Sequence, residues 1–310
     1  MKHAHSLHTI TPEELRARLD AAENLFLIDT LPADHFYKVH LPGARNACVF
    51  EMTFIDQVHA LCSDSSCPIV VYGIGNNSLD SRTAAEKLSM AGYSNVTLLE
   101  GGLERWKQSG LPLHGTAPNT LEETDRLLAD GEYTVITDES IIGWTGRNSN
   151  TSHYGTVGLA NGHLHVEDGT IQGSFTVDME SIENINLAGS DLQKVLISHL
   201  KSEDFFLTDG FPAARFNIRG GRFAREAEPT RPNCELSGTL DLRGIQNDLS
   251  FKATLVKWLD GRLHLTAHFD LDRTLWGITY GSSSYYQHLG MHTVFDGISI
   301  EMKIVAELTE

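Results

Sequence analysis

The chain has 310 residues, 41% of them hydrophobic, and a formal net charge of −17 at pH 7. This length exceeds one typical domain, so we expect two, and the apolar content excludes global disorder. An acidic surface repels phosphate groups, so we expect neither nucleic acid nor an anionic membrane surface among the partners.

Targeting signals and cysteines set further limits. No apolar run reaches the roughly 18 residues of a transmembrane helix, and residues 1–8 lack the apolar core of a secretion signal. We therefore expect a cytoplasmic protein that does not span a membrane. Its four cysteines include no Cys-x-x-Cys pair and are expected to be free thiols in a reducing compartment. Cys62 and Cys67 would make only half of a zinc site, so we predict no metal there.

The first part of the chain alternates between strand-like and helical segments. Thr11-Pro12-Glu13-Glu14 is a strong helix start, with a threonine cap, a proline at the first position and an acidic first turn. Strands alternating with helices at this spacing predict a parallel α/β sheet with flanking helices. We expect strands at 25–28, 69–72 and 96–99, and helices at 11–19, 33–39, 50–62, 81–91 and 101–110.

The stretch from Ile69 to Leu88 joins a buried strand, a polar loop and a helix that Ser81 is expected to cap. Unpaired N–H groups and the helix dipole converge at such a loop, which makes it a candidate anion cradle. Covalent sulfur handling needs a thiolate as well, and the loop contains no cysteine. The candidate anion-binding residues are Gly73, Gly75, Ser78, Ser81 and Arg82.

Five motifs follow one another in this part of the chain. They are Ile28-Asp29, His40-Leu41-Pro42-Gly43-Ala44, Val70-Val71-Tyr72, Ser81-x-x-Ala84-Ala85 and Gly101-Gly102-Leu103-x-x-Trp106. In order and spacing they make residues 10–114 resemble a single rhodanese domain. The resemblance implies a persulfide-forming cysteine directly after the Val-Val-Tyr strand. Gly73 stands there, and counting back from the helix gives Gly75.

We therefore predict no catalytic residue in the rhodanese-like domain. Cys67 precedes the strand and is expected at its opposite end, too far away to replace the missing thiol. Two interpretations of the loop stay open, an inert retained scaffold and a residual pocket for an anion or a partner. The alternative function is a sulfurtransferase or another anion-handling enzyme that uses residues 73–82.

From Tyr133 the pattern changes to the period-two alternation of antiparallel strands. About eight runs, separated by turns at Asn161-Gly162, Glu167-Asp168-Gly169 and Asp260-Gly261, predict a closed barrel. One helix is expected from Ser190 to Ser202. Its predicted apolar side comprises Leu192, Val195, Leu196, His199 and Leu200.

The change of pattern also sets the domain boundaries. We expect a rhodanese-like domain at 1–116, a linker at 117–131 and a barrel domain at 132–310. Pro118 and the Asn119-Thr120 pair interrupt the chain in the linker, which also has a short amphipathic segment at 121–129.

The barrel region carries motifs of its own. They are Ile142-x-Trp144-Thr145-Gly146, Gly155-Thr156-Val157, His199-Leu200-Lys201-Ser202-x-Asp204-Phe205-Phe206, Phe211-Pro212-x-Ala214-x-Phe216, Gly238-Thr239-Leu240-x-Leu242-x-Gly244-Ile245 and Asp272-Arg273-x-x-Trp276-Gly277-Ile278-x-Tyr280-Gly281. Together they make residues 132–308 resemble the YceI-like family of lipocalin-shaped, polyisoprenoid-binding proteins. The resemblance implies a long apolar ligand inside the barrel. Many members are exported, and the missing secretion signal departs from that pattern.

A barrel of eight strands can hold one extended apolar ligand if its own side chains do not fill it. Ordinary core packing is the alternative role for each residue of the expected ligand-binding wall. Asp272 and Arg273 are candidates for a polar head group, with a salt bridge or a turn hydrogen bond as the alternative. The expected wall residues are Phe175, Leu196, Phe205, Phe206, Phe216 and Trp276.

Histidines offer a metal hypothesis that the spacing does not support. His163 and His165 share one strand face, as do His264 and His268, but neither pair has carboxylate or cysteine partners in register. His3, His5 and His8 lie in an N-terminal tail. His199 is expected to be a buried, hydrogen-bonded histidine. We predict no metal and no cofactor.

These patterns predict a protein that binds a long-chain isoprenoid or fatty lipid in its barrel. The rhodanese-like module then serves as a scaffold or docks an unidentified protein partner, and a homodimer is an expectation from the resemblance alone. A pure interaction scaffold with a solidly packed barrel is a further alternative.

Overall fold

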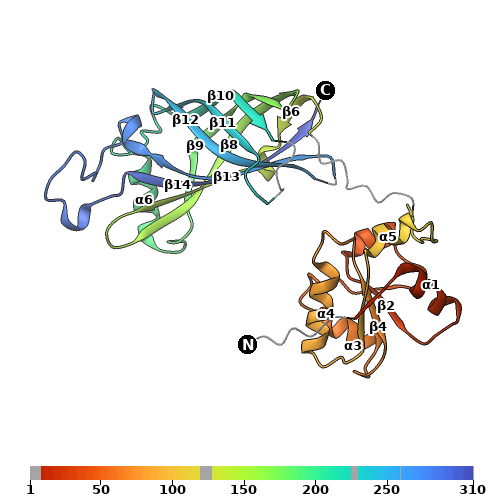
Figure 1. Cartoon of the computed structure of the whole chain (residues 1–310). Helices are drawn as coiled ribbons and strands as arrows, with labels where there is room; N and C mark the ends of the chain where they lie inside the picture. Colours follow the sequence, from red (N-terminus) through yellow and green to blue (C-terminus); the bar gives the residue numbers. More distant parts are fainter. Residues whose placement is uncertain (1–7, 119–127, 225–229, 259, 310) are drawn as a thin grey trace. The chain divides into compact units, whose positions relative to one another are not determined.

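A computed structural model describes residues 8–118, 128–224, 230–258 and 260–309. The chain divides into two compact units, Met1–Glu123 and Thr124–Glu310, and each is described by itself (Figure 1). None of the described helices is long and apolar enough to cross a membrane. The predicted segment at 121–129 lies mostly outside the described residues.

The N-terminal unit is a parallel sheet of five strands, as predicted. Short polar strands at each edge, β1 and β3, were not expected from the sequence, because only the central strands have apolar runs. In spatial order the strands are β1 (His8–Ile10), β5 (Val96–Leu99), β4 (Ile69–Tyr72), β2 (Phe26–Asp29) and β3 (Arg45–Asn46).

Helices cover both faces of this sheet, because alternate residues of β4 enter different cores. Val70 and Tyr72 pack in one apolar cluster with residues of α1 and α5, whereas Ile69 and Val71 pack in the other with residues of α3 and α4. Thr11 and Glu14 form the capping box of α1. The five helices are α1 (Pro12–Asp20), α2 (Ala33–Lys38), α3 (Phe54–Leu61), α4 (Asp80–Met90) and α5 (Gly102–Gln108).

The helix predicted from Phe50 begins only at Phe54. Phe50 is 71% exposed, so its apolar side chain takes no part in the core that gives α3 its pattern.

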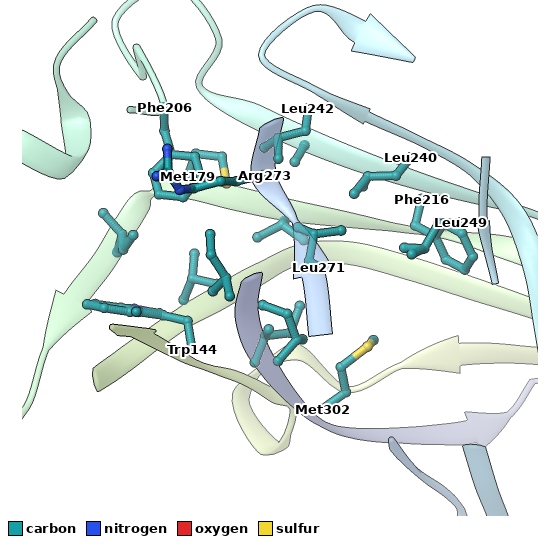
Figure 2. A pocket seen from close by; sticks show the side chains of 18 of the residues that line it. Trp144, Met179, Phe206, Phe216, Leu240, Leu242, Leu249, Leu271, Arg273 and Met302 are labelled. Atoms are coloured by element: carbon teal, nitrogen blue, oxygen red, sulfur yellow. The ribbon is translucent and has the colours of Figure 1, made fainter. Parts of the chain in front are cut away.

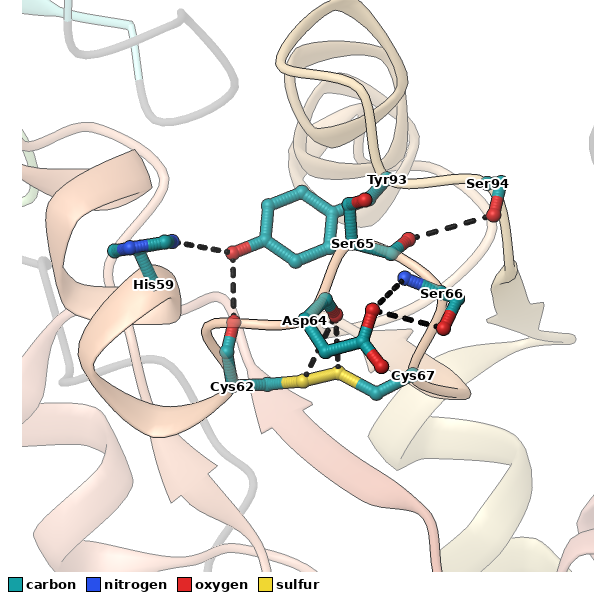
Figure 3. Close-up of a disulfide and its surroundings, with 8 residues drawn as sticks. All are labelled: His59, Cys62, Asp64, Ser65, Ser66, Cys67, Tyr93 and Ser94. Carbon is teal, nitrogen blue, oxygen red and sulfur yellow. Dashed lines mark hydrogen bonds between the residues drawn. A yellow bond between two sulfur atoms is a disulfide. The ribbon is translucent and has the colours of Figure 1, made fainter.

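A disulfide joins Cys62 to Cys67 in the loop between α3 and β4, so the expectation of free thiols is wrong for this pair (Figure 3). Both sulfur atoms lie close to the carbonyl oxygen of Asp64, at 3.2 and 2.9 Å. The Asp64 carboxylate accepts hydrogen bonds from the backbone N–H of Ser66 at 2.9 Å and from its hydroxyl at 2.8 Å, which closes the loop tightly. This local turn brings the cysteines together. Cys48 and Cys234 are free and buried.

The C-terminal unit is a closed antiparallel barrel, as predicted (Figure 1). Strands β8 to β13 pair in sequence order, and β13 also pairs with β14. β6 and β7 each pair with both β8 and β14, at different heights, so together they fill the eighth position. The strands are β6 (Gly131–Val135), β7 (Ile141–Arg147), β8 (Ser152–Glu167), β9 (Thr170–Asn184), β10 (Ala213–Phe223), β11 (Cys234–Leu242), β12 (Ile245–Lys257), β13 (Leu263–Asp272) and β14 (Gly297–Leu308).

The turn predicted at Asn161-Gly162 is wrong, because both residues lie inside β8 and pair with β9. A register shift between Leu159 and Asn161 marks a bulge there. A Cβ on Gly162 would come within 2.8 Å of Val135 and 2.9 Å of Phe175, so the glycine serves close packing instead of a turn. Short 3-10 helices complete the unit at Thr137–Glu139 (η1), Arg273–Trp276 (η2) and Gly290–His292 (η3).

Among its described residues this unit has one α-helix, α6 (Asp191–Lys201). The Ser190 hydroxyl caps its first turn by accepting from the N–H of Leu192 at 3.2 Å. Leu200 is buried, and Leu196 packs against the barrel core. Leu192 and Val195 are 63% and 64% exposed, so their predicted place on the apolar side is wrong. The face of α6 that packs against the barrel is therefore narrower than the sequence pattern indicated.

Candidate functional site

The barrel encloses a cavity of about 160 Å³ (Figure 2). Strand periodicity builds it, because alternate residues such as Phe175, Val177 and Met179 of β9 point inward. Apart from Gly146 and Arg273, every lining residue has an aliphatic, aromatic or thioether side chain. The barrel is therefore not packed solid, and its interior favours an apolar ligand.

Four of the six predicted wall residues, Phe175, Phe205, Phe206 and Phe216, line this cavity. Leu196 instead borders a neighbouring hollow beside α6. Trp276 is 1% exposed and does not line the cavity, and its Nε1 donates to the carbonyl oxygen of Leu240 at 3.0 Å. The sequence pattern could not distinguish such packing residues from the wall, since both kinds are large and apolar.

Aromatic rings pack closely along one part of the wall. Phe251 stacks on Phe269 with ring centroids 4.3 Å apart, and Phe216 lies 5.4 Å from Phe251. Figure 2 shows Phe216 and Leu249 toward one end of the cavity, and Trp144 and Phe206 toward the other.

Among the described residues, Arg273 is the one charged residue that lines the cavity, and three of its N–H groups already have acceptors. Its Nε, Nη1 and Nη2 donate to the carbonyl oxygens of Phe295, Ile278 and Val294 at 3.1, 2.6 and 3.1 Å. Burial lowers the pKa of the guanidinium from its usual value. Arg273 thus ties the segment after η2 to the barrel.

The carboxylate of Asp272 likewise has internal partners. It accepts from the N–H and the hydroxyl of Thr274 at 3.0 and 2.7 Å and caps η2. The polar atoms of the Asp272-Arg273 pair therefore serve the local structure, which is the alternative that we gave for them.

A second hollow, of about 250 Å³, adjoins the cavity, and we call it the vestibule. It shares Trp144, Gly146, Leu200, Phe205 and Val294 with the cavity, so the two spaces lie next to each other. In contrast to the cavity, its lining is mixed, and six of its thirteen residues are polar. The polar residues that border it are Arg147, Asn148, His153, His199, Tyr280 and His292.

His199 belongs to α6 and borders the vestibule. Its Nε2 lies 3.0 Å from Asp204 Oδ2, and its ring packs edge-on against Phe205 and Tyr280 at centroid distances of 5.0 and 4.8 Å. It is hydrogen-bonded, as expected, although its side chain is 33% exposed.

The other histidines have unrelated surroundings. His165 Nδ1 lies 2.6 Å from Glu132 Oε1, His163 Nδ1 lies 3.4 Å from Ser174 Oγ, and the ring of His264 lies against Trp258. His8 belongs to β1, whereas His3 and His5 fall outside the described residues. In the described ranges no three His, Cys, Asp or Glu side chains gather in a way that would hold a metal ion.

In the N-terminal unit, acidic side chains fill the loop that follows β4. A Cβ built on Gly73 would overlap the carboxylate of Asp80, and one built on Gly75 would overlap the carboxylate of Glu104. Both positions at which a cysteine could stand are therefore occupied by side chains from α4 and α5.

Asp80 also accepts three hydrogen bonds from residues in and beside this loop. Its Oδ2 accepts from the N–H of Ile74 at 3.2 Å and from the Ser78 hydroxyl at 2.9 Å, and its Oδ1 accepts from the N–H of Ser81 at 2.6 Å. The helix begins at Asp80, so the prediction that Ser81 is the N-cap is wrong. Ser81 is buried inside the first turn, and the Arg82 side chain is exposed.

A second buried carboxylate lies at the end of the neighbouring strand. Asp29 is fully buried, and its Oδ1 accepts from the N–H of Leu31 at 2.8 Å. Burial raises its pKa to about 7, and the nearby Asp80 adds to this shift. The carboxyl edge of the sheet therefore has acidic groups of its own.

Two family models match the chain in agreement with this geometry. Residues 133–306 match the YceI-like domain, and residues 11–109 match the Rhodanese-like domain. The first match covers more than half of the chain, which therefore belongs to the YceI-like family, with a rhodanese-like domain preceding the barrel.

Individual relatives match one part of the chain each. The adenylyltransferase and sulfurtransferase UBA4 of Candida albicans is 33% identical over 103 residues, which are 31% of this chain and 23% of that protein. The chain thus spans about a quarter of that relative's length. BcnA of Burkholderia cenocepacia has 14% identity and a TM-score of 0.42, over 55% of this chain and 98% of its own. A polyisoprenoid binding domain of Saccharophagus degradans has 12% identity and a TM-score of 0.41, over 57% and 98%.

Proposed function

We propose that the barrel binds an isoprenoid or a similar lipid chain. The observation that carries this proposal is the cavity inside the barrel, whose lining is almost wholly carbon and sulfur. Membership of the YceI-like family supports it, because the sequence resemblance implies a long apolar ligand in this barrel. A ligand of this kind is held by burial of its apolar surface and needs no fixed polar partner along its chain.

Cavity size bears on how such a chain is accommodated. A hole of roughly 150 Å³ lined by apolar side chains can hold one benzene ring, so the cavity of about 160 Å³ has room for about one isoprene unit. A longer chain displaces side chains of the wall. Met179 and Met302 line the cavity and are suited to this, because methionine is unbranched and has three rotatable bonds. Each further isoprene unit then contributes about 4 kcal/mol of gross stabilisation, at about 0.8 kcal/mol per buried CH₂.

We further propose that the rhodanese-like unit is a non-catalytic scaffold or docking module. Sulfur transfer needs a thiolate, and glycines occupy both candidate positions. Asp80 and Glu104 fill the adjacent space, and their charges repel an anionic sulfur donor. The protein partner of this unit and a homodimer remain predictions.

Organic extraction of the purified protein, followed by mass spectrometry, tests lipid binding. We expect a co-purifying isoprenoid or fatty chain, or uptake of added prenyl chains from a series of increasing length. Ala214→Phe places a ring inside the cavity and should abolish uptake, whereas Ala213→Phe, on the outer side of the same strand, should leave it unchanged. A clean extract together with no uptake at any length would sink the proposal.

A thiosulfate:cyanide assay tests the scaffold role. We expect no turnover above that of the uncatalysed reaction. Turnover that is lost when Asp80 or Ser78 is replaced by alanine would show that the loop is catalytic and would overturn the scaffold proposal.

A further inference from the structure

Trp144 is a buried tryptophan whose indole N–H has no partner. The side chain is 9% exposed, and its Nε1 is among the few buried polar atoms with no hydrogen bond to the described part of the chain. The two other buried tryptophans differ, since Trp106 Nε1 donates to Pro112 O at 2.9 Å and Trp276 Nε1 donates to Leu240 O at 3.0 Å. A buried donor without an acceptor destabilises the protein, so the unpaired indole N–H of Trp144 calls for a functional explanation.

Trp144 stands where the cavity meets the vestibule, and it lines both. Figure 2 shows it toward the end of the cavity opposite Phe216 and Leu249. A chain that fills the cavity from that aromatic end therefore passes the indole as it enters the vestibule. The first polar atom of such a ligand arrives beside an unpaired donor.

Basic side chains border the vestibule beyond Trp144, and two of them have partners of their own, since His199 Nε2 lies 3.0 Å from Asp204 Oδ2 and Arg147 Nη1 donates to Ser299 Oγ at 2.8 Å. Arg147 and three histidines, His153, His199 and His292, border it, and no aspartate or glutamate is among its lining residues. This lining contrasts with the net charge of −17 of the whole chain. Asn148 contributes no free acceptor here, because its Oδ1 already accepts from the N–H groups of Asn150 and Thr151 at 2.8 Å.

We propose that Trp144 and the vestibule form a head-group site for a hydrogen-bond-accepting oxygen group at the end of the ligand chain. The indole N–H donates to the first oxygen after the apolar chain, and Arg147 and the histidines face the outer part of the head group. A hydroxyl, a carbonyl and a phosphate share this acceptor chemistry. The inference rests on the proposed lipid binding and adds the chemical class of the head group.

Three ligands with one fifteen-carbon prenyl skeleton separate the parts of this proposal, namely farnesene, which has no oxygen, farnesol and farnesyl phosphate. Binding is measured by calorimetry for the full-length protein and for Trp144→Phe, which keeps an aromatic ring but removes the donor. We expect farnesol and farnesyl phosphate to bind the variant roughly tenfold more weakly than the wild type, and farnesene to bind both equally. Trp258→Phe, at a 56% exposed position, is the matched control and should change nothing.

A direct readout does not depend on the variant's stability. In a ¹⁵N–¹H spectrum, the indole signal that Trp144→Phe removes should move downfield when the wild type binds farnesol or farnesyl phosphate, and stay in place with farnesene. Arg147→Gln should weaken farnesyl phosphate more than farnesol if the natural head group is a phosphate, and both equally if it is neutral. Either preference supports a head-group site.

Two failures are distinguishable. If all three ligands bind, but Trp144→Phe lowers none of their affinities and the indole signal does not move, the head-group site is refuted and lipid binding stands. If no ligand binds the wild type, the proposed function fails and the head-group site fails with it.

Discussion

The barrel interior and the loop after β4 differ in what fills them. The barrel encloses a cavity of about 160 Å³ bordered by apolar side chains, and beside it lies an indole donor without a partner. In the loop, Asp80 accepts hydrogen bonds from Ile74, Ser78 and Ser81 and fills the space next to Gly73. The barrel therefore offers volume and a free donor, whereas in the loop a carboxylate of the chain itself accepts three hydrogen bonds.

This difference teaches that a fold does not determine what fills its loops and interior. The parallel sheet, its helices and the turn into α4 are all present in the N-terminal unit, and the side chains of Asp80 and Glu104 fill the space next to Gly73 and Gly75. The side chains of each region, and not the fold, therefore decide how much space is left for a ligand. The same reasoning makes the barrel the unit in which a ligand should be sought.

The largest expected effect is on stability, and it compares a side chain packed in the core with one that borders the cavity. Trp276→Ala should lower the free energy of unfolding of the barrel by about 3–5 kcal/mol, because Trp276 is fully buried and its N–H is bonded. Leu249→Ala should lower it by no more than about 2 kcal/mol, since Leu249 borders the cavity and loses fewer contacts. Urea denaturation measures both. Equal losses would mean that the cavity is closed in solution.

The acidic edge of the N-terminal sheet predicts a pH dependence. Burial raises the pKa of Asp29 to about 7, above its ordinary value of 3.8, so the folded state binds this proton more tightly than the unfolded state. Stability should therefore fall as pH rises from about 4 to about 7, by no more than about 4 kcal/mol, and then level off.

Asn at position 29 keeps an oxygen that can accept from the N–H of Leu31 but carries no charge. Asp29→Asn should remove this slope and be more stable than the wild type above pH 7, as followed by thermal unfolding across pH. A wild type whose stability rises over this range would contradict the buried-carboxylate account.

Restoring a cysteine tests how firmly the loop is closed. Gly73→Cys should lower the free energy of unfolding by about 1–3 kcal/mol, because its Cβ overlaps the Asp80 carboxylate, and should gain no thiosulfate:cyanide turnover. Adding Asp80→Ala should recover part of the loss, which a double-mutant cycle measures. Ser89→Cys, at an exposed position of α4, is the control. A Gly73→Cys variant that is stable and active would contradict the conclusion that the loop after β4 is filled whereas the barrel has free space.

The elements were predictable from sequence where one local signal decides them. The Thr11 capping box, the apolar strands β2, β4 and β5 and the Ser190 cap of α6 follow from neighbouring residues alone. The failed turn prediction in β8 depends on distant contacts instead. Asn161-Gly162 has the composition of a turn, yet pairing with β9 and packing on Val135 keep it inside β8.

The candidate site was predictable in part, for a related reason. Phe175 and Phe216 were among the expected wall residues, and both line the cavity. Trp144 belongs to one of the barrel motifs, but the motif does not predict that its indole N–H lacks an acceptor. That property depends on which carbonyl groups the fold brings near the ring, and Trp276, which does find one, has the same side chain.

The smallest expected effect concerns the covalent link in the N-terminal unit. The Cys62–Cys67 disulfide closes a short loop, and the loss of chain entropy in the unfolded state predicts a stabilisation of at most about 2 kcal/mol. Protein purified without reductant should show two thiols on denaturation, those of Cys48 and Cys234, and four after reduction. The Cys62→Ser/Cys67→Ser variant should resemble the reduced protein and be insensitive to reductant. Four thiols before reduction would show that local turn geometry holds the pair together without the bond, because the Asp64 hydrogen bonds to Ser66 close the loop in either state.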